Sequence, residues 1–452
     1  MKGIRISTRQ NLRRGIAEVI LMTPFGVVFA PGAFVLAALF TQWFGIEKTV
    51  YGFLVSLPFL ANAAQTLVFP FLTRLGAPKR LTLAMAWINL AICFVMAAAL
   101  PFLPRNGGTL VVAVITALFA LASLSGSFSA VGWTAWIREW IPERLRGGYL
   151  GRRNSISAAC TLIFLGVVML VFKFFPDSIW TFVGILGFAA VMRFLSLLIL
   201  HTIHAPRPAV AIESSSLLPA LRQCLNSPGL PIFILFSAWT NFWMGFSGPF
   251  GPVFCFEELG LGPDIFALLT AISTLSAVAG WAFWGKVADR AGNIPVLIFG
   301  MIVWESSNVL WAVLNPGNSW LLYPMFLWAG FFSVAFFLGS FNLLLKLVPD
   351  KCSVAAVSIH LGMTSAAVGV APILAGWLLE EFLVQRGHGI AVYHFGFFVK
   401  TAATLLGLLL LYSVREPGRT RHKSIPAALR SLTRIMTAQA TVLLKKAIGS
   451  RR

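Results

Sequence analysis

Three ionisable side chains lie inside long apolar stretches of the sequence, and their chemistry suits proton transfer. They are Glu305, His360 and Glu18. A charge within a membrane span costs about 2.5–3.5 kcal/mol on insertion scales, so such residues default to functional candidates. We rank them in that order as candidates for proton coupling. The structural alternatives are a buried hydrogen-bonded pair for Glu305, a satisfied core histidine for His360, and an arginine or helix-start partner for Glu18.

Two cations, Arg193 and Lys400, also lie in apolar stretches. Each is near enough to the end of its stretch to reach the membrane surface or to brace a neighbouring helix. We expect structural bracing for both.

A short charged motif separates two apolar stretches in the second half of the chain. It contains Gly285, Asp289, Arg290 and Gly292, and we predict a tight hairpin. The first half has a poorer copy around Arg74 and Gly76. One hairpin in two places predicts two related halves.

The composition identifies the class of protein. The chain has 452 residues, of which 58% are hydrophobic and 11% charged. The mean hydropathy is +0.84. Soluble domains carry about 25% charged residues, so an integral membrane protein is indicated. The net charge of +20 reflects basic loops and termini, and no nucleic-acid partner is predicted.

No motif indicates chemistry at a covalent bond. The five cysteines are scattered without a C-x-x-C pair, and no phosphate-binding loop or H-E-x-x-H sequence occurs. We therefore predict no enzyme activity, no cofactor and no metal.

Twelve apolar runs are long enough to cross a bilayer. We expect an all-α membrane fold, with twelve helices in two pseudo-symmetric six-helix bundles. The predicted parts are a first bundle (1–204), a cytoplasmic linker (205–228), a second bundle (229–414) and a basic tail (415–452). Lys and Arg gather in alternate loops, which predicts that both termini are cytoplasmic. The tail is predicted to be either an amphipathic helix on the anionic leaflet or a disordered segment.

These motifs resemble those of the major facilitator superfamily over nearly all of the chain except the tail. Gly285, Asp289, Arg290 and Gly292 match the loop motif of that superfamily. A second block is similar to the loop between helices 4 and 5 in a poorly characterised bacterial branch. Its residues are Trp133, Trp136, Glu139, Ile141, Pro142, Arg146, Gly147, Tyr149, Gly151 and Arg153.

The resemblance implies a gate at the cytoplasmic mouth. Asp289 would lie against the start of helix 11 and Arg290 would pair with Asp350, a contact that we call the inner latch. Glu139, Arg146 and Arg153 would form an ion cluster beside it. The alternatives are a topological anchor at the motif and a solvated loop between helices 4 and 5.

The resemblance also implies which residues line a central cavity. Helices 1, 4, 7 and 10 face the cavity in this superfamily, and helices 2, 5, 8 and 11 assist. The mid-span candidates on these helices are Asn62, Gln65, Trp133, Asn154, Trp239, Asn241, Trp243, Asn342 and His360. Amides with indoles suit a neutral polar or amphipathic ligand, and each residue has helix–helix contact as its alternative role.

The predicted function is secondary transport of a small solute by alternating access, with H⁺ as a candidate coupling ion and membrane lipids as the surroundings of a monomer. The alternative is a lipid-handling or receptor-like protein of the same fold without solute flux.

Overall fold

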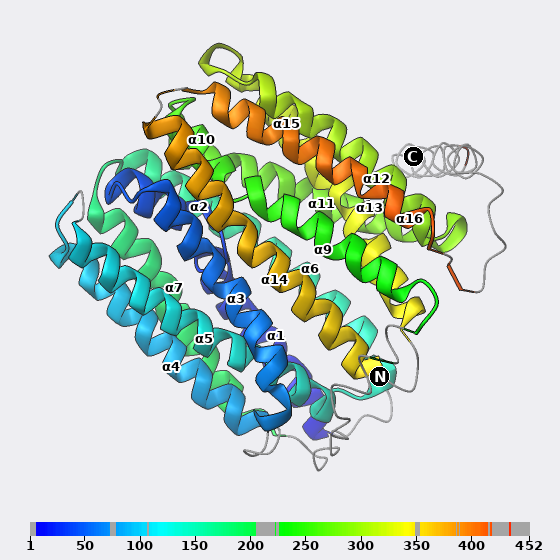
Figure 1. Ribbon diagram of the computed structural model, residues 1–452. Coiled ribbons are helices and arrows are strands. Elements are labelled where there is room, and N and C mark those ends of the chain that lie inside the picture. Colours follow the sequence, from blue (N-terminus) through cyan, green and yellow to red (C-terminus); the bar gives the residue numbers. More distant parts are fainter. Residues whose placement is uncertain are drawn as a thin grey trace, which may run out of the picture. The chain divides into compact units, whose positions relative to one another are not determined.

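The computed structural model describes residues 6–72, 78–105, 108–204, 226–348, 353–385 and 389–414, and single residues 222, 387, 416, 417 and 434. These residues form helices and no strand, which confirms the predicted all-α fold (Figure 1). Ten helical segments among them are long and apolar enough to cross a bilayer. The first two predicted spans also contain helices, so the described residues are consistent with twelve crossings.

The first half of the chain forms these elements in order: α1 (Ile6–Val28), α2 (Phe34–Ala37), η1 (Ala38–Trp43), α3 (Lys48–Leu72), α4 (Pro78–Ala99), η2 (Leu100–Phe102), α5 (Thr109–Trp140), α6 (Glu143–Phe174) and α7 (Ile179–His201).

The second half forms the following elements: α9 (Leu230–Ser247), α10 (Phe250–Glu257), α11 (Pro263–Ala291), α12 (Asn293–Asn308), η3 (Val309–Val313), η4 (Pro316–Leu321), α13 (Leu322–Leu347), α14 (Ser353–Leu379), η6 (Glu380–Gln385), α15 (Ala391–Leu406) and α16 (Leu408–Leu411).

Contacts between Cα atoms divide the chain into two compact units. Unit 1 contains residues 1–214, 245–271 and 361–392, and unit 2 contains residues 215–244, 272–360 and 393–452. Unit 1 thus joins the first-half helices to α10 and to parts of α11 and α14. Most of the predicted linker lies outside the described residues, and the predicted bundle boundaries stay a prediction.

Small residues bring helices together within each unit. A methyl group on Gly132 of α5 would come within 2.6 Å of the Thr82 hydroxyl on α4. In unit 2 a methyl on Gly330 of α13 would collide with the Ser273 carbonyl of α11. Close backbone approach of this kind drives helix association in membranes, where lipid removes the hydrophobic drive between helices.

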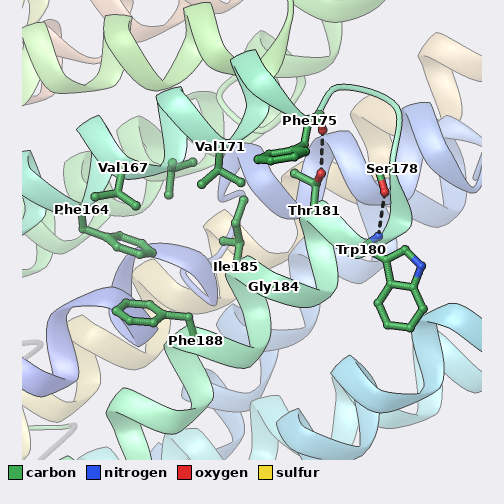
Figure 2. Close-up of a pocket in the computed structure, with 11 residues that line it drawn as sticks. Phe164, Val167, Val171, Phe175, Ser178, Trp180, Thr181, Gly184, Ile185 and Phe188 are labelled. Carbon is green, nitrogen blue, oxygen red and sulfur yellow. Dashed lines mark hydrogen bonds between the residues drawn. The ribbon is translucent and has the colours of Figure 1, made fainter.

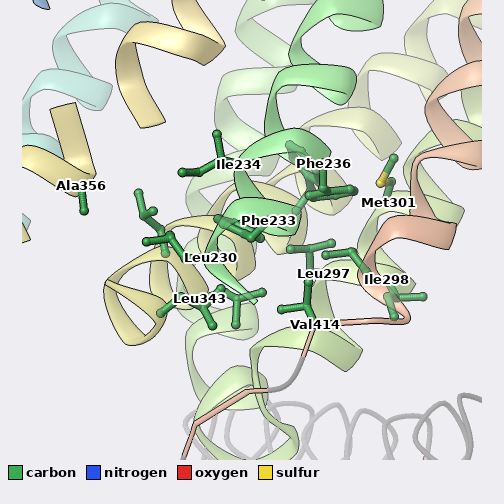
Figure 3. Packing of buried hydrophobic residues seen from close by; sticks show 14 residues of the cluster. Leu230, Phe233, Ile234, Phe236, Leu297, Ile298, Met301, Leu343, Ala356 and Val414 are labelled. Atoms are coloured by element: carbon green, nitrogen blue, oxygen red, sulfur yellow. The ribbon is translucent and has the colours of Figure 1, made fainter. Parts of the chain in front are cut away.

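Large apolar side chains fill the remaining space of unit 2. Figure 3 shows Phe233 and Phe236 of α9 packed with Leu297 and Met301 of α12 and Leu343 of α13. All five side chains are buried. This cluster packs α9, α12 and α13 together, and the buried residues of α11 beside the charged motif belong to a separate cluster.

Two predicted loops are helices in the structure, so both predictions were wrong. Residues 285–291 form the last turns of α11, and Gly292 alone makes the turn, with φ 96°. Arg153 lies within α6, because that helix begins at Glu143, directly after Pro142. Most charged residues of both segments are lysine, arginine or glutamate, which are good helix formers, and the helices extend beyond the apolar runs.

Candidate functional site

The start of α3 is a meeting point of the two halves of the chain within unit 1. Lys48 is the first residue of α3, and its Nζ lies 2.7 Å from Oε2 of Glu257 at the end of α10. Its backbone N–H donates to Oε2 of Glu380, which begins η6, at 2.8 Å. A carboxylate at a helix N-terminus is stabilised by the helix dipole and by the unsatisfied N–H groups.

Further contacts one turn along α3 reinforce this meeting point. The buried Tyr51 hydroxyl donates to the Pro249 carbonyl at 3.0 Å, and its ring packs edge-on against Phe250. A methyl on Gly52 would collide with the Pro372 carbonyl of α14, and one on Gly376 with the Lys48 carbonyl. We call the set Lys48, Tyr51, Gly52, Pro249, Glu257, Pro372, Gly376 and Glu380 the Lys48 seal.

Sequence reasoning missed the Lys48 seal. In the sequence Lys48 is one of a few cations between apolar runs on the predicted outer side, and Glu257 and Glu380 belong to no motif. Their positions at the ends of apolar runs were the available signal, but pairing over such long sequence separations has no local pattern.

The charged motif of the second half lies at the end of α11. Trp284 and Val287 are fully buried, and the Trp284 indole donates to the Phe331 carbonyl at 3.0 Å. Asp289 and Arg290 are exposed. The predicted partner Asp350 lies outside the described residues, as do Arg74 and Gly76, so the inner latch stays a prediction.

A carboxylate that the sequence did not indicate holds the turn after this motif. Glu416 accepts hydrogen bonds from Asn293 N and Nδ2, both at 2.9 Å, and from Lys346 Nζ at 2.8 Å. Burial alone would raise the pKa of Glu416, but hydrogen bonds from Lys346, Ile294 and Asn293 outweigh it and hold that pKa below its usual value. Glu416 therefore caps α12.

The first-half counterpart uses the opposite charge. Lys79, at the start of α4, donates to the carbonyls of His201 and Ile203 at 2.9 and 2.7 Å. These carbonyls belong to the end of α7, where helix carbonyls lack intrahelical partners. Lys79 thus caps the end of α7 in the first half, whereas Glu416 caps the start of α12 in the second half.

The ion cluster predicted between the fourth and fifth spans, which correspond to α5 and α6, is only partly described. The side chain of Arg146 lies outside the described residues. Glu139 is half-buried at the end of α5, and burial raises the pKa of its carboxyl. Arg153 is in another place, deeper in α6.

Arg153 meets Glu18 within the first-half helices. Its Nη2 donates to Glu18 Oε2 at 2.9 Å, and its guanidinium lies 4.9 Å from the centre of the Trp133 ring. Arg193 Nη1 lies 3.7 Å from Glu18 Oε1, and Ser196 donates to that oxygen at 3.3 Å. We call Glu18, Arg153, Arg193 and Ser196 the Glu18 cluster.

Lys400 of α15 forms a tight pair with Glu305 of α12 in unit 2. Its Nζ lies 2.8 Å from Oε1 and 2.7 Å from Oε2, and the Glu305 side chain is fully buried. Asn308 donates to the same carboxylate at 3.1 Å. Lys400 thus joins α15 to α12, and Arg193 joins α7 to α1, each within its own unit.

The predicted cavity residues in unit 1 have different surroundings. Asn62 accepts from Ser127 at 2.8 Å, so α3 and α5 are joined there. Gln65 is half-buried, with no hydrogen-bond partner for Oε1 among the described residues. Trp133 stacks against Arg153, and Asn154 is exposed.

In unit 2, two predicted cavity residues have hydrogen-bond partners on protein helices. The Trp239 indole donates to the Ala403 carbonyl at 2.7 Å and packs 6.0 Å from the Trp243 ring. Asn241 donates to Ser237 one turn earlier at 2.8 Å. Asn342 is half-buried, and the His360 ring stacks on Phe233. A substrate-lining role for these residues stays a prediction.

An apolar groove of about 440 Å³ lies between α6 and α7. Figure 2 shows Phe164, Val171 and Ile185 along it, with Phe188 facing Phe164. The Ser178 and Thr181 hydroxyls at one end are already bonded to backbone groups. None of the predicted polar cavity residues lines this groove.

Comparison with solved structures identifies the class of fold. The structure is similar to a point mutant of the nucleoside transporter NupG, with TM-score 0.70 and 14% identity over 90% of this chain and 100% of that one. The structure is also similar to that of a D-xylose-proton symporter, with TM-score 0.66 and 16% identity over 91% of this chain and 99% of that one. For an inward-facing bacterial homologue of the lysosomal transporter Spinster, the TM-score is 0.65 and the identity 13%, over 92% of this chain and 100% of that one. At such identities the likeness shows the fold, which is the fold of multi-pass membrane transporters.

The sequence adds the family. Residues 242–451 match the Major Facilitator Superfamily. No curated protein sequence matches the chain significantly. The second half of the chain thus matches this family, and the fold over nine-tenths of the chain is similar to that of solved membrane transporters.

Proposed function

We propose that this protein moves a small solute across a bacterial inner membrane by alternating access, and that the Lys48 seal is the gate on the outer side. The seal is the observation that carries the proposal. It joins α3 of the first half to α10 and α14 of the second half, all within unit 1. A solute can pass this end only if these contacts separate.

The composition of the seal suits a gate that opens and closes. The Lys48–Glu257 pair keeps 15% and 25% of its side chains exposed, so water screens it. Partly exposed ion pairs are worth about 0–1 kcal/mol. Loss of one pair on opening is therefore an energy that binding of a solute can offset.

We propose that the inner latch acts at the opposite end. Asp289 and Arg290 lie exposed on the last turn of α11, at the end of the helix where the resemblance places the cytoplasmic gate. Glu416 and Lys346 fix the following turn, so the two side chains are held at a defined place. Both termini are cytoplasmic in this arrangement.

We propose that proton coupling, where it operates, uses Glu18 rather than Glu305. The Glu305 side chain is fully buried and is held by Lys400 through both oxygens. Glu18 contacts Arg153, whose side chain is 13% exposed, whereas Lys400 beside Glu305 is 9% exposed. A carboxylate that exchanges protons must reach water in at least one state.

The lipid-handling alternative rests on the apolar groove between α6 and α7. The groove can hold an acyl chain, but it lies beside one pair of neighbouring helices and offers no charged lining side chain for a headgroup. The absence of a charged lining residue favours a groove filled by a bound acyl chain over a path along which whole lipids are transferred. We propose no enzymatic step for the chain.

Accessibility of one cavity residue from the two sides tests the function. In a variant without native cysteines, Gln65→Cys is labelled with a membrane-impermeant maleimide in right-side-out and inside-out vesicles. Lys48→Ala and Glu257→Ala are expected to raise the outer-side labelling rate several-fold, because one pair worth about 1 kcal/mol changes an equilibrium about fivefold. Arg105→Ala is the control cation at the same end. Labelling unaffected by either seal variant would contradict the gate.

A further inference from the structure

The Glu18 cluster contains one carboxylate and two guanidiniums. Among the described residues, Glu18 is the one acidic side chain in ion-pair contact with either Arg153 or Arg193. The side-chain exposures are 3% for Glu18, 8% for Arg193 and 13% for Arg153. An arginine does not lose its proton in a protein, so the cluster carries a permanent surplus of one positive charge.

A surplus charge at such a place calls for a partner. An uncompensated buried ion costs several kcal/mol, and protein interiors pair nearly all of their charges. Both guanidiniums lie over aromatic rings, with Arg153 Cζ 4.9 Å from the centre of the Trp133 ring and Arg193 Cζ 5.9 Å from that of Phe25. Rings stabilise a cation from its face and leave its N–H edge free to donate.

Donors near the cluster also lack acceptors. Among the described residues, Arg193 Nε and the Tyr149 hydroxyl are buried without a hydrogen-bond partner. Tyr149 lies on α6 one turn before Arg153, close enough to interact electrostatically with Arg153 and Glu18. Buried donors without acceptors are uncommon in native structures and call for an explanation.

We propose that the Glu18 cluster recognises the oxyanion of an organic-anion substrate, a carboxylate or a phosphate ester, with Arg153 as the contacting residue. This inference rests on the proposed transport function and names its substrate class. Arg153 is the most exposed member, so an anion meets it first and binds in place of Glu18. It differs from the expectation of a neutral polar or amphipathic ligand, which rested on the amides and indoles among the candidate cavity residues.

The same geometry links the anion to a proton. Glu18 on α1 faces Arg153 and Tyr149 of α6 and Arg193 and Ser196 of α7, with Cys93 of α4 near Arg193. A proton taken from water by the Glu18 carboxylate removes its charge and frees the Arg153 N–H groups. Protonation of Glu18 and binding of an anion therefore favour each other, so anion affinity rises as the pH falls.

Matched solutes test this inference on the purified full-length protein. Thermal stabilisation is measured with three pairs that differ in charge: glucuronate and glucose, lactate and propane-1,2-diol, and glycerol 3-phosphate and glycerol. We expect at least one anion to stabilise the protein more than its neutral counterpart. If no anion in the panel exceeds its neutral partner, the inference is overturned.

Variants locate the binding with the anion so identified. Arg153→Gln should weaken binding about tenfold to about a hundredfold, as loss of a charge-assisted hydrogen bond does. Arg105→Gln is the matched control, because Arg105 stacks on Trp43 at 4.3 Å but lies outside the cluster. Equal effects of the two variants would overturn the assignment.

Glu18→Gln supplies a second test if Arg153→Gln fails to fold. It mimics protonated Glu18, so it should bind the anion at least as tightly as the parent protein at neutral pH, with affinity independent of pH. Weaker binding would overturn the link to the proton. If the solute panel and both variants give the contrary results, the anion site is ruled out. The proposed transport function is still supported in that case if cysteine accessibility alternates between the two sides.

Discussion

The two halves of the chain each bury an ion cluster, and the clusters differ in charge balance and in access to water. In the second half one lysine meets one glutamate through both oxygens, and the pair is neutral. In the first half two arginines share one glutamate, and one arginine keeps an exposed edge. Arg193 lies on α7 and Lys400 on α15. The difference indicates bracing in the second half and bracing combined with recognition in the first.

The largest expected effect is loss of one partner of the second-half pair. Glu305→Gln leaves the Lys400 ammonium buried without a counter-charge. Breaking such a pair lowers the free energy of unfolding by about 3–5 kcal/mol. The measurement is denaturant or thermal unfolding of the detergent-purified protein.

A hydrophobic replacement of the whole pair is its control. Glu305→Leu combined with Lys400→Met should be neutral or stabilising, because both desolvation penalties disappear together. If the double variant is as unstable as Glu305→Gln, the pair does more than brace two helices.

The next effect belongs to the first-half cluster. Glu18→Gln should lower the free energy of unfolding by about 1–3 kcal/mol, since hydrogen bonds to a charged group are lost while Arg153 can still reach water. Added glucuronate or glycerol 3-phosphate should recover part of the stability that Glu18→Gln loses. Neither anion should recover the stability of Glu305→Gln. Equal responses of the two variants to anions would remove the distinction between the halves.

The helix ends beside the charged motifs sharpen the same contrast. Glu416→Gln should lower the free energy of unfolding by about 1 kcal/mol near neutral pH, as loss of a helix cap does. The pKa of Glu416 is lowered on folding from its ordinary 4.5. Its contribution is therefore complete above pH 4.5 and is lost as the pH falls through the folded value, so parent and variant should converge in acid.

The smallest effect concerns Glu139. Burial raises the pKa of this carboxyl, so its ionised form is disfavoured in the folded protein. The penalty is absent below the unfolded pKa, grows as the pH rises from the unfolded to the folded pKa, and is complete above the folded one. Glu139→Gln should therefore change stability at pH 7 by at most about 0.5 kcal/mol, toward greater stability. A clear loss of stability would reveal an ion-pair partner and support the predicted cluster at the inner mouth.

The fold was predictable because its signal is local. Runs of about 20 apolar residues separated by basic loops identify membrane helices without knowledge of their partners. Helix ends were less well predicted. Residues 285–291 and Arg153 look like loops because they are charged, yet both continue helices beyond the apolar run.

The candidate site was predicted only as a set of side chains. The sequence indicates that Glu18, Glu305, Arg193 and Lys400 need partners in an apolar setting, but not which ones. Partner choice depends on which helix faces meet, as when Glu18 meets Arg153, 135 residues further along the chain. Glu416 was missed because it stands at the start of a basic tail, where a carboxylate suggests only a solvated end.

The Lys48 seal provides the most direct test of transport by alternating access. Lys48→Cys and Glu257→Cys are combined with Gln65→Cys in the background without native cysteines, and the outer pair is joined by a short thiol-specific cross-linker that a reductant can cleave. Cross-linking is expected to abolish labelling of Gln65→Cys from the outer side and to leave labelling from the inner side, and the reductant should reverse the effect. Unchanged outer-side labelling with the pair fully cross-linked would contradict it.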